Sequence, residues 1–231
     1  MNPSTTILQG TRTLTYGGQQ TSRCPTFLLD RYEDLLDGQH LAWTEHLRFT
    51  RLLGAGGQGV VYLSHRRGCD EFTLPVALKL FSPERFGSQQ EYDVAMGRIG
   101  AVSCSVAKIQ HDSLLDVQNF IERNGIRIME MEWVDGYDLD RLLTPAMLAR
   151  AEQRVKPRRW EQINNVVATA GPVRPRLKPG IAVAIIRQCL GALAALHREH
   201  IVHGDIKPAN IMVKRTGAAK IVDIGSALHL D

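Results

Sequence analysis

The sequence predicts an α+β fold in which a β-rich first part is followed by a helical second part. Two strand-like runs, 49–53 and 60–64, flank a glycine-rich turn, and an apolar run follows at 76–79. Two more strand-like segments lie within 113–132. A long apolar stretch at 179–198 begins with proline, which is tolerated at the first position of a helix. These observations place strands first and helices second, which is typical of the α+β class.

The chain divides into three predicted segments. Residues 1–46 form an N-terminal extension, of which about the first 25 are rich in Ser, Thr, Gly and Gln and are expected to be flexible. Helical spacing of apolar residues within 27–47 predicts a helix that packs on the β-rich part. Residues 47–132 form the β-rich lobe, and residues 133–231 form a connection and a helical lobe.

Three further segments complete the predicted secondary structure. Residues 91–110 read as a helix with one apolar face, formed by Met96, Ile99, Val102, Val106 and Ile109. Residues 138–153 are also expected to be helical. The stretch 156–178 is interrupted by Pro, Gly and Arg and is predicted to be an inserted loop.

Composition is that of an ordinary globular protein. Hydrophobic residues make up 44% of the chain and charged residues 23%, with a net charge of +4. Basic residues gather at 154–159 and 174–178, where a solvated loop is expected. Because no aromatic residues are interleaved with them, we predict no nucleic-acid partner.

Cysteine usage and hydropathy indicate a cytoplasmic protein. The four cysteines, Cys24, Cys69, Cys104 and Cys189, are scattered and form no metal or redox motif, which suits a reducing compartment. The first nine residues lack the pattern of a signal peptide, and no run approaches eighteen apolar residues. We therefore predict no membrane partner.

A group of polar residues near the end of the chain has the form of a phosphoryl-transfer centre. The stretch HGDIKPAN begins at His203, and VDIG follows with its aspartate at 223. Asp205 could accept the proton of an attacking hydroxyl, and Lys207 could neutralise the transferring phosphate. Asn210 and Asp223 could hold magnesium ions that bridge nucleotide phosphates.

A glycine-rich turn upstream suits the same chemistry. Gly54, Ala55, Gly56 and Gly59 belong to a GxGxxG pattern that lies between two strand-like runs rather than between a strand and a helix. This favours a hairpin lid over phosphates, where glycine allows close approach of the backbone. Lys79 follows Gly59 by twenty residues, within the sequence VALK.

Taken in order, these motifs resemble the protein kinase family, in the serine/threonine branch found in bacteria, over roughly residues 47–231. The resemblance implies a bilobal fold with a small β-rich lobe. It also implies ATP-dependent phosphorylation of serine or threonine in a protein substrate, with ATP and Mg²⁺ as cofactors. Asp205 is similar to the catalytic base and Lys207 to the catalytic-loop lysine. Lys79 is similar to the lysine that binds the α- and β-phosphates.

The resemblance also implies the adenine side of the nucleotide site. Val61 and Ala77 would line the pocket above the adenine, and Met131 would close its back. Backbone groups of Glu132 and Val134 would hydrogen-bond the adenine edge.

Asp138 has two interpretations, and both stay open. By resemblance it would bind the ribose. Aspartate also commonly starts a helix, and the sequence from Leu139 onward looks helical.

The sequence departs from the family pattern at three places. The arginine that usually precedes the catalytic aspartate, and pairs with a phosphorylated activation loop, is Gly204 here. The phenylalanine of the magnesium-binding Asp-Phe-Gly motif is Ile224. The third departure concerns the helix that supplies a glutamate to the lysine.

No glutamate stands at the expected position of that helix. Counting back from the family's histidine-containing turn places Val102 there. The acids of the helix are Glu91 and Asp93, near its start, where they would also suit the helix dipole. Glu91, Asp93 or neither therefore pairs with Lys79.

The chain ends soon after the Asp-Ile-Gly motif, since eight residues follow Asp223. The predicted helix 179–198 is apolar around most of its circumference and would need cover from a downstream segment or a partner chain. We therefore expect an incomplete kinase domain. The isolated chain is expected to be oligomeric, partner-bound or poorly soluble, and not to phosphorylate proteins.

Two other functions stay open. The chain could be a non-catalytic nucleotide-binding or interaction module, that is, a truncated kinase or pseudokinase. A small-molecule kinase of the aminoglycoside or choline type is suggested by His203-Gly204-Asp205. Lys207 and the glycine-rich turn argue against that second alternative.

Overall fold

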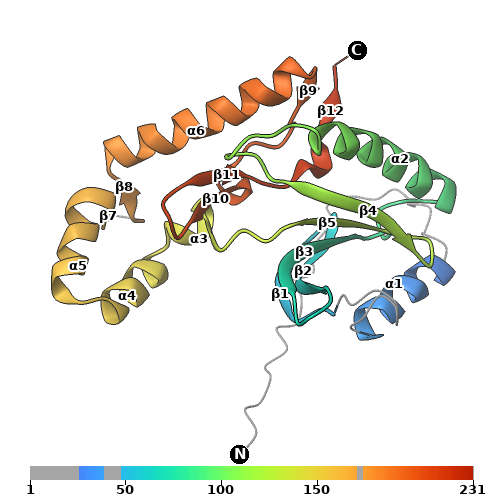
Figure 1. Cartoon of the computed structure of the whole chain (residues 1–231), viewed down its shortest axis with the longest axis horizontal. Coiled ribbons are helices and arrows are strands. Elements are labelled where there is room, and N and C mark those ends of the chain that lie inside the picture. Colours follow the sequence, from blue (N-terminus) through green and yellow to red (C-terminus); the bar gives the residue numbers. More distant parts are fainter. Residues whose placement is uncertain (1–25, 39–47, 171–173, 231) are drawn as a thin grey trace, which may run out of the picture.

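The computed structural model of the chain describes residues 26–38, 48–170 and 174–230 (Figure 1). The predicted flexible start, and the predicted boundary at residues 46 and 47, lie outside these ranges. Within them an antiparallel sheet comes first in the chain, and most of the helices follow it. The predicted α+β class is therefore confirmed, while the predicted domain limits stay a prediction.

Five strands form the sheet of the first lobe, in the spatial order β1-β2-β3-β5-β4 with every neighbour antiparallel. They are β1 (Arg51–Gly56), β2 (Gly59–Arg67), β3 (Thr73–Phe81), β4 (Val117–Arg123) and β5 (Ile126–Glu132). The turn between β1 and β2 is the glycine-rich motif, so the predicted hairpin is confirmed. β3 lies in the centre of the sheet, where apolar β-branched and aliphatic residues are favoured.

Two helices pack on this sheet, and in Figure 1 α2 lies above and α1 below β4 and β5. α1 (Thr26–Gly38) buries Leu28, Tyr32 and Leu35, which confirms the predicted helix as far as residue 38, while residues 39–47 of that prediction lie outside the described ranges. α2 (Gln89–Val106) begins at Ser88, whose Oγ accepts a hydrogen bond from the Glu91 amide at 3.1 Å. This bond satisfies one of the free amides at the helix start.

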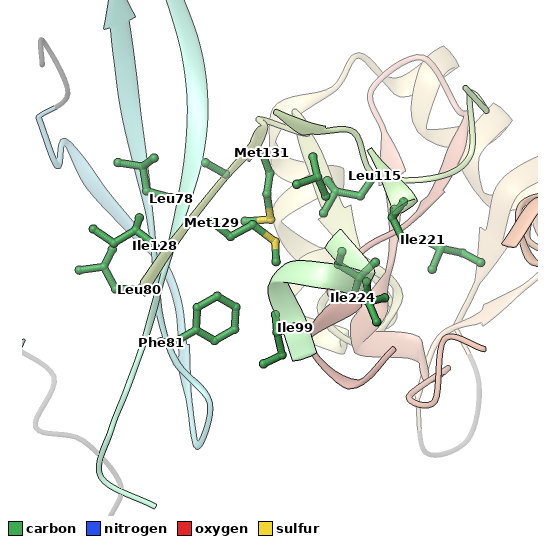
Figure 2. Packing of buried hydrophobic residues seen from close by; sticks show 14 of the residues in the cluster. Leu78, Leu80, Phe81, Ile99, Leu115, Ile128, Met129, Met131, Ile221 and Ile224 are labelled. Carbon is green, nitrogen blue, oxygen red and sulfur yellow. The ribbon is translucent and has the colours of Figure 1, made fainter. Parts of the chain in front are cut away.

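The core continues from the sheet into the second lobe (Figure 2). Because side chains alternate along a strand, Leu78 and Leu80 occupy one face of β3 and Phe81 the other. On that other side lie Ile99 of α2 and Ile224, which stands where the family has phenylalanine. Ile224 is buried, so the smaller side chain still packs.

The segment after the sheet differs in part from the prediction. The helix expected at 138–153 is broken into α3 (Leu139–Leu142) and α4 (Pro145–Arg154), because Thr144 starts a new helix and accepts from the Met147 amide. The loop expected at 156–178 instead contains α5, a π-helical turn and a short hairpin. Their bounds are Pro157–Gln162, Ile163–Val167, and Ala168–Thr169 (β7) with Arg176–Leu177 (β8).

The last helix, α6 (Pro179–Arg198), has the bounds that the sequence predicts. One side packs against β9 and β11 through Ile185, Cys189 and Leu196, which are buried. On another side Val183, Ile186 and Leu190 are 64%, 57% and 59% exposed. The helix is also long and apolar enough, by composition alone, to cross a membrane, a test that the core helices of folded domains pass as well.

Short strands after α6 build the platform for the site. They are β9 (Ile201–Val202), β10 (Ile211–Lys214), β11 (Ala219–Ile221) and β12 (Leu228–His229). β10 pairs with β11 and with β6 (Gly136–Asp138), and β12 pairs with β9. These pairings bring the loops after β9 and β11 together.

Candidate active site

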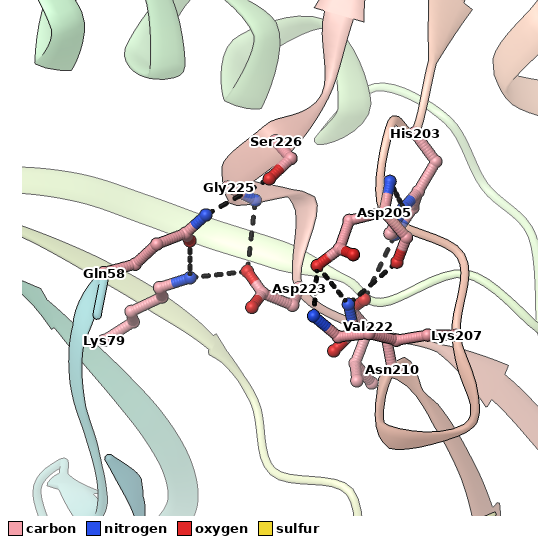
Figure 3. A network of polar contacts seen from close by, with 10 residues as sticks. All are labelled: Gln58, Lys79, His203, Asp205, Lys207, Asn210, Val222, Asp223, Gly225 and Ser226. Atoms are coloured by element: carbon pink, nitrogen blue, oxygen red, sulfur yellow. Dashed lines mark hydrogen bonds and ion pairs between the residues drawn. The ribbon is translucent and has the colours of Figure 1, made fainter. Parts of the chain in front are cut away.

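The loop between β9 and β10 carries the three predicted catalytic-loop residues, and all three contact one another (Figure 3). Oδ2 of Asp205 accepts hydrogen bonds from Lys207 Nζ at 2.7 Å and from Asn210 Nδ2 at 2.9 Å. Asn210 Nδ2 also donates to the Asp205 carbonyl at 2.8 Å. The bond from Lys207 holds the pKa of Asp205 below its usual range, which favours a carboxylate at neutral pH.

His203 ties this loop to the segment that precedes Asp223. Its Nε2 lies 3.1 Å from the Val222 carbonyl oxygen, which can only accept, so Nε2 carries the proton. Its Nδ1 accepts from the Asp205 amide at 3.4 Å. Burial lowers the pKa of His203, in agreement with this neutral tautomer.

Gly204, which stands in the place of the family's arginine, has a backbone that favours glycine. Its φ is +76°, and a Cβ atom built on it would lie 2.5 Å from the Ser226 carbonyl oxygen. L-residues rarely adopt this φ, and the close approach leaves no room for a side chain. The departure at this position therefore has a local steric reason.

Replacing Gly204 with alanine is expected to lower the free energy of unfolding by about 3 kcal/mol, from the left-handed φ and the clash together. Gly217→Ala is the matched control, because Gly217 has φ +90° but nothing within 4 Å of its Cβ position. It should lose only about 1 kcal/mol. Equilibrium urea unfolding measures both, and equal losses would show that the contact with Ser226 does not matter.

Asp223 lies directly opposite Lys79 of β3. Its Oδ1 accepts from Lys79 Nζ at 2.5 Å and from the Gly225 amide at 3.2 Å. Asp223 has φ +63°, a conformation that aspartate tolerates better than most residues. The Lys79 side chain is 6% exposed, whereas that of Asp223 is 35% exposed. The ion pair therefore links a buried lysine of the first lobe to a partly exposed aspartate of the second lobe.

Gln58 and Ser226 also belong to this cluster, and the sequence did not single out either residue. Lys79 Nζ donates to Gln58 Oε1 at 2.7 Å, and Gln58 Nε2 donates to Ser226 Oγ at 3.1 Å (Figure 3). A Cβ atom at Gly225 would collide with this group. The position of Gln58 at the tip of the glycine-rich turn is the one sequence signal that could have indicated its contact with Lys79.

Neither acid of α2 pairs with Lys79. Glu91 Oε2 accepts from the Gly87 amide at 2.8 Å, at the start of its own helix. Asp93 forms an ion pair with Arg127 of β5 at 2.9 Å. The sequence left open whether Glu91, Asp93 or neither pairs with Lys79, and in the structure neither residue does.

The residues predicted for the adenine side lie on the neighbouring strands β2, β3 and β5, except Val134, which follows β5. Val61 of β2 pairs with Lys79, and Ala77 of β3 pairs with Met131 of β5. Ala77, Met131 and Val134 are buried. The Glu132 side chain accepts from Lys220 and, at 2.8 Å, from the Asp116 amide.

Asp138 has the capping role, which was one of its two interpretations. It precedes α3, and its Oδ1 accepts from the Arg141 amide at 2.8 Å. The satisfied amide explains why the helix starts at this point. The ribose role of Asp138 stays a prediction.

The residues predicted to hold magnesium are brought together by the backbone. The Val222 amide donates to the Asn210 carbonyl at 2.9 Å, which places Asn210 beside Asp223. Asn210 Nδ2 faces Asp205, so its Oδ1 is turned away, and amide and carboxylate oxygens are ligands that Mg²⁺ prefers. Across the described ranges no group of three or more His, Cys, Asp and Glu side chains is placed to hold a metal ion. Asn210 and Asp223 supply an amide oxygen and a carboxylate, which are suitable ligands for Mg²⁺.

This arrangement of a glycine-rich hairpin, a β-strand lysine and two polar loops is typical of the two-lobed protein kinase fold. The protein kinase domain family matches residues 47–231, and the chain belongs to this family, in its bacterial serine/threonine branch. The serine/threonine-protein kinase PknH of Mycobacterium bovis is 32% identical over 182 residues, which are 79% of this chain and 24% of PknH. PknD of Mycobacterium tuberculosis is 30% identical over 177 residues, 77% of this chain and 21% of PknD.

A solved structure has the same fold. The kinase domain of Mycobacterium tuberculosis PknI, crystallised as a double mutant, matches with a TM-score of 0.54 and 25% identity. The match covers 78% of this chain and 58% of the PknI chain. The chain thus spans about a quarter of the length of its curated relatives and somewhat more than half of this kinase domain.

Proposed function

We propose that this chain carries the nucleotide-binding and catalytic residues of an ATP-dependent protein serine/threonine kinase. The observation that carries the proposal is the convergence of Asp205, Lys207 and Asn210 on one loop beside the Lys79–Asp223 pair. Its relatives, which are named as serine/threonine-protein kinases, support the same reaction. In that reaction the γ-phosphate of ATP passes to a serine or threonine hydroxyl of a protein substrate.

Asp205 is suited to orient the hydroxyl and accept its proton. Its carboxyl group is ionised at neutral pH, and the bonds from Lys207 and Asn210 hold its position. Lys207, which is exposed beyond Asp205, can then offset negative charge on the phosphate in transfer.

Lys79 and the glycine-rich turn would hold the phosphates of ATP, and Asn210 and Asp223 would hold Mg²⁺. The ion, when bound, neutralises charge on the phosphate oxygens and orients them for transfer. Gly59 is suited to the turn because its φ is +130° and a Cβ there would collide with the Leu80 carbonyl oxygen. Glycine at this position therefore lets the turn lie close against the backbone of β3.

A non-catalytic interaction module is the second candidate, and the exposed side of α6 favours it. Val183, Ile186 and Leu190 present apolar surface that another polypeptide would cover. A small-molecule kinase is disfavoured by the direct bond from Lys207 to Asp205. A cytoplasmic location, and the lack of nucleic-acid and membrane partners, stay predictions.

The proposed reaction predicts phosphate on serine or threonine. The 231-residue chain and the longest natural polypeptide that contains it should each be incubated with radiolabelled ATP, Mg²⁺ and a generic protein substrate. We expect phosphoserine or phosphothreonine from the natural polypeptide, and binding of the nucleotide by the 231-residue chain. Phosphotyrosine alone, or transfer only to an aminoglycoside or choline, would contradict the proposal.

A further inference from the structure

Lys79 is held by a residue of the glycine-rich turn, and this arrangement carries an inference about the proposed site. The ammonium group donates to Gln58 Oε1 at 2.7 Å and to Asp223 Oδ1 at 2.5 Å (Figure 3). A lysine has three donors, so one remains for a further acceptor. Because lysine only donates, the amide oxygen of Gln58 must face Lys79 and its NH₂ group must face Ser226.

The helix beside the site offers Lys79 no carboxylate. Its acids, Glu91 and Asp93, are engaged with the Gly87 amide and with Arg127. Its buried side consists of Tyr92, Met96, Ile99, Val102, Ser103 and Val106. In kinases the lysine of this strand commonly pairs with a glutamate from the helix, and that pair is required for activity. In this chain the orienting contact has to come from elsewhere.

Gln58 is well placed to supply that contact. Its backbone carbonyl accepts from the Ser82 amide at 3.1 Å, which anchors it to the end of β3, three residues beyond Lys79. Gly59, the next residue, pairs with Phe81, and Val61 pairs with Lys79 itself. Gln58 therefore directly precedes the strand that pairs with the lysine strand, and its Nε2 donates to Ser226 Oγ in the second lobe.

We propose that Gln58 is the positioning residue of Lys79, in place of a carboxylate from α2. The inference rests on the proposed nucleotide-binding function. Gln58 would direct the ammonium group toward the phosphates whether or not Asp223 also holds Mg²⁺. A neutral amide orients Lys79 without adding a negative charge that would offset the positive charge facing the nucleotide. The position of the glycine-rich turn and the placement of the lysine are thereby coupled.

Two variants and a matched control test this proposal in the 231-residue chain. Gln58→Met removes the amide at similar length, and Gln58→Asn keeps an amide that is one methylene too short to reach Lys79. Gln90→Met is the matched control, because it makes the same glutamine-to-methionine change at an exposed position on α2. Calorimetry gives the dissociation constants for Mg-ATP and for adenosine, which has no phosphate for Lys79 to bind.

We expect both Gln58 variants to bind Mg-ATP about ten-fold more weakly, the loss typical of a hydrogen bond to a charged group. Their affinity for adenosine should stay within about two-fold of the wild type, and Gln90→Met should change neither constant. Unchanged binding of Mg-ATP would overturn the inference alone. So would equal losses for Mg-ATP and adenosine, which would indicate a role in folding the turn. A wild-type chain that binds no Mg-ATP would overturn the proposed function, and this inference with it.

Discussion

Replacing Asp205 with asparagine is expected to lower the rate of phosphoryl transfer by about two to four orders of magnitude, the contribution typical of a general base. Asparagine keeps the size of the side chain and can still accept from Lys207 and Asn210, but it cannot take the proton of the attacking hydroxyl. The loss should appear in kcat, because the bonds of the Asp205 side chain go to Lys207 and Asn210 and not to Lys79 or the glycine-rich turn, which are proposed to hold the phosphates of ATP.

The measurement is steady-state transfer by the longest natural polypeptide that contains this chain. Asp140→Asn, at an exposed position in α3, is the matched control and should leave kcat within about two-fold. A kcat for Asp205→Asn equal to that of the control would exclude Asp205 as the base.

The arginine that usually precedes the catalytic aspartate in this family is Gly204 here, so we also expect activity to survive removal of phosphate from the activation loop.

Replacing Lys79 with alanine is expected to remove the thermal stabilisation that Mg-ATP gives to the chain. A ligand at one hundred times its dissociation constant stabilises the native state by about 2.7 kcal/mol, or roughly 5–10 °C in Tm for a chain of this size. Lys79 is the buried cation at the site, so its loss leaves the phosphates without their main charged partner.

The quantity to compare between variants is the rise in Tm on adding Mg-ATP. The Tm without ligand changes as well, because Lys79→Ala breaks the ion pair with Asp223. Lys79→Met, which keeps most of the buried aliphatic chain, provides a second variant. Lys108→Ala, at an exposed position after α2, is the control and should keep the full shift. A Lys79 variant that keeps the wild-type shift would show that the phosphates lie elsewhere.

Long apolar patterns and local caps explain where the prediction of secondary structure succeeded. α6 begins and ends as predicted, because its proline start and apolar run extend over twenty residues. α5 was missed within the predicted loop 156–178, since its six residues bury no side chain and show no period. Thr144 and Pro145 carried the signal for the break between α3 and α4, and the apolar period across them obscured it.

Residue order alone was enough to predict the loop that carries Asp205, Lys207 and Asn210, because residues within five positions of one another can meet through local turns. The partners of Lys79 depend on the tertiary structure instead. Gln58 lies 21 residues from it and Asp223 lies 144 residues away, while Gln58 and Ser226 are separated by 168 residues. Such contacts depend on strand register and on which side of α2 faces the sheet, and a neutral glutamine carries no charge pattern that would reveal its partner.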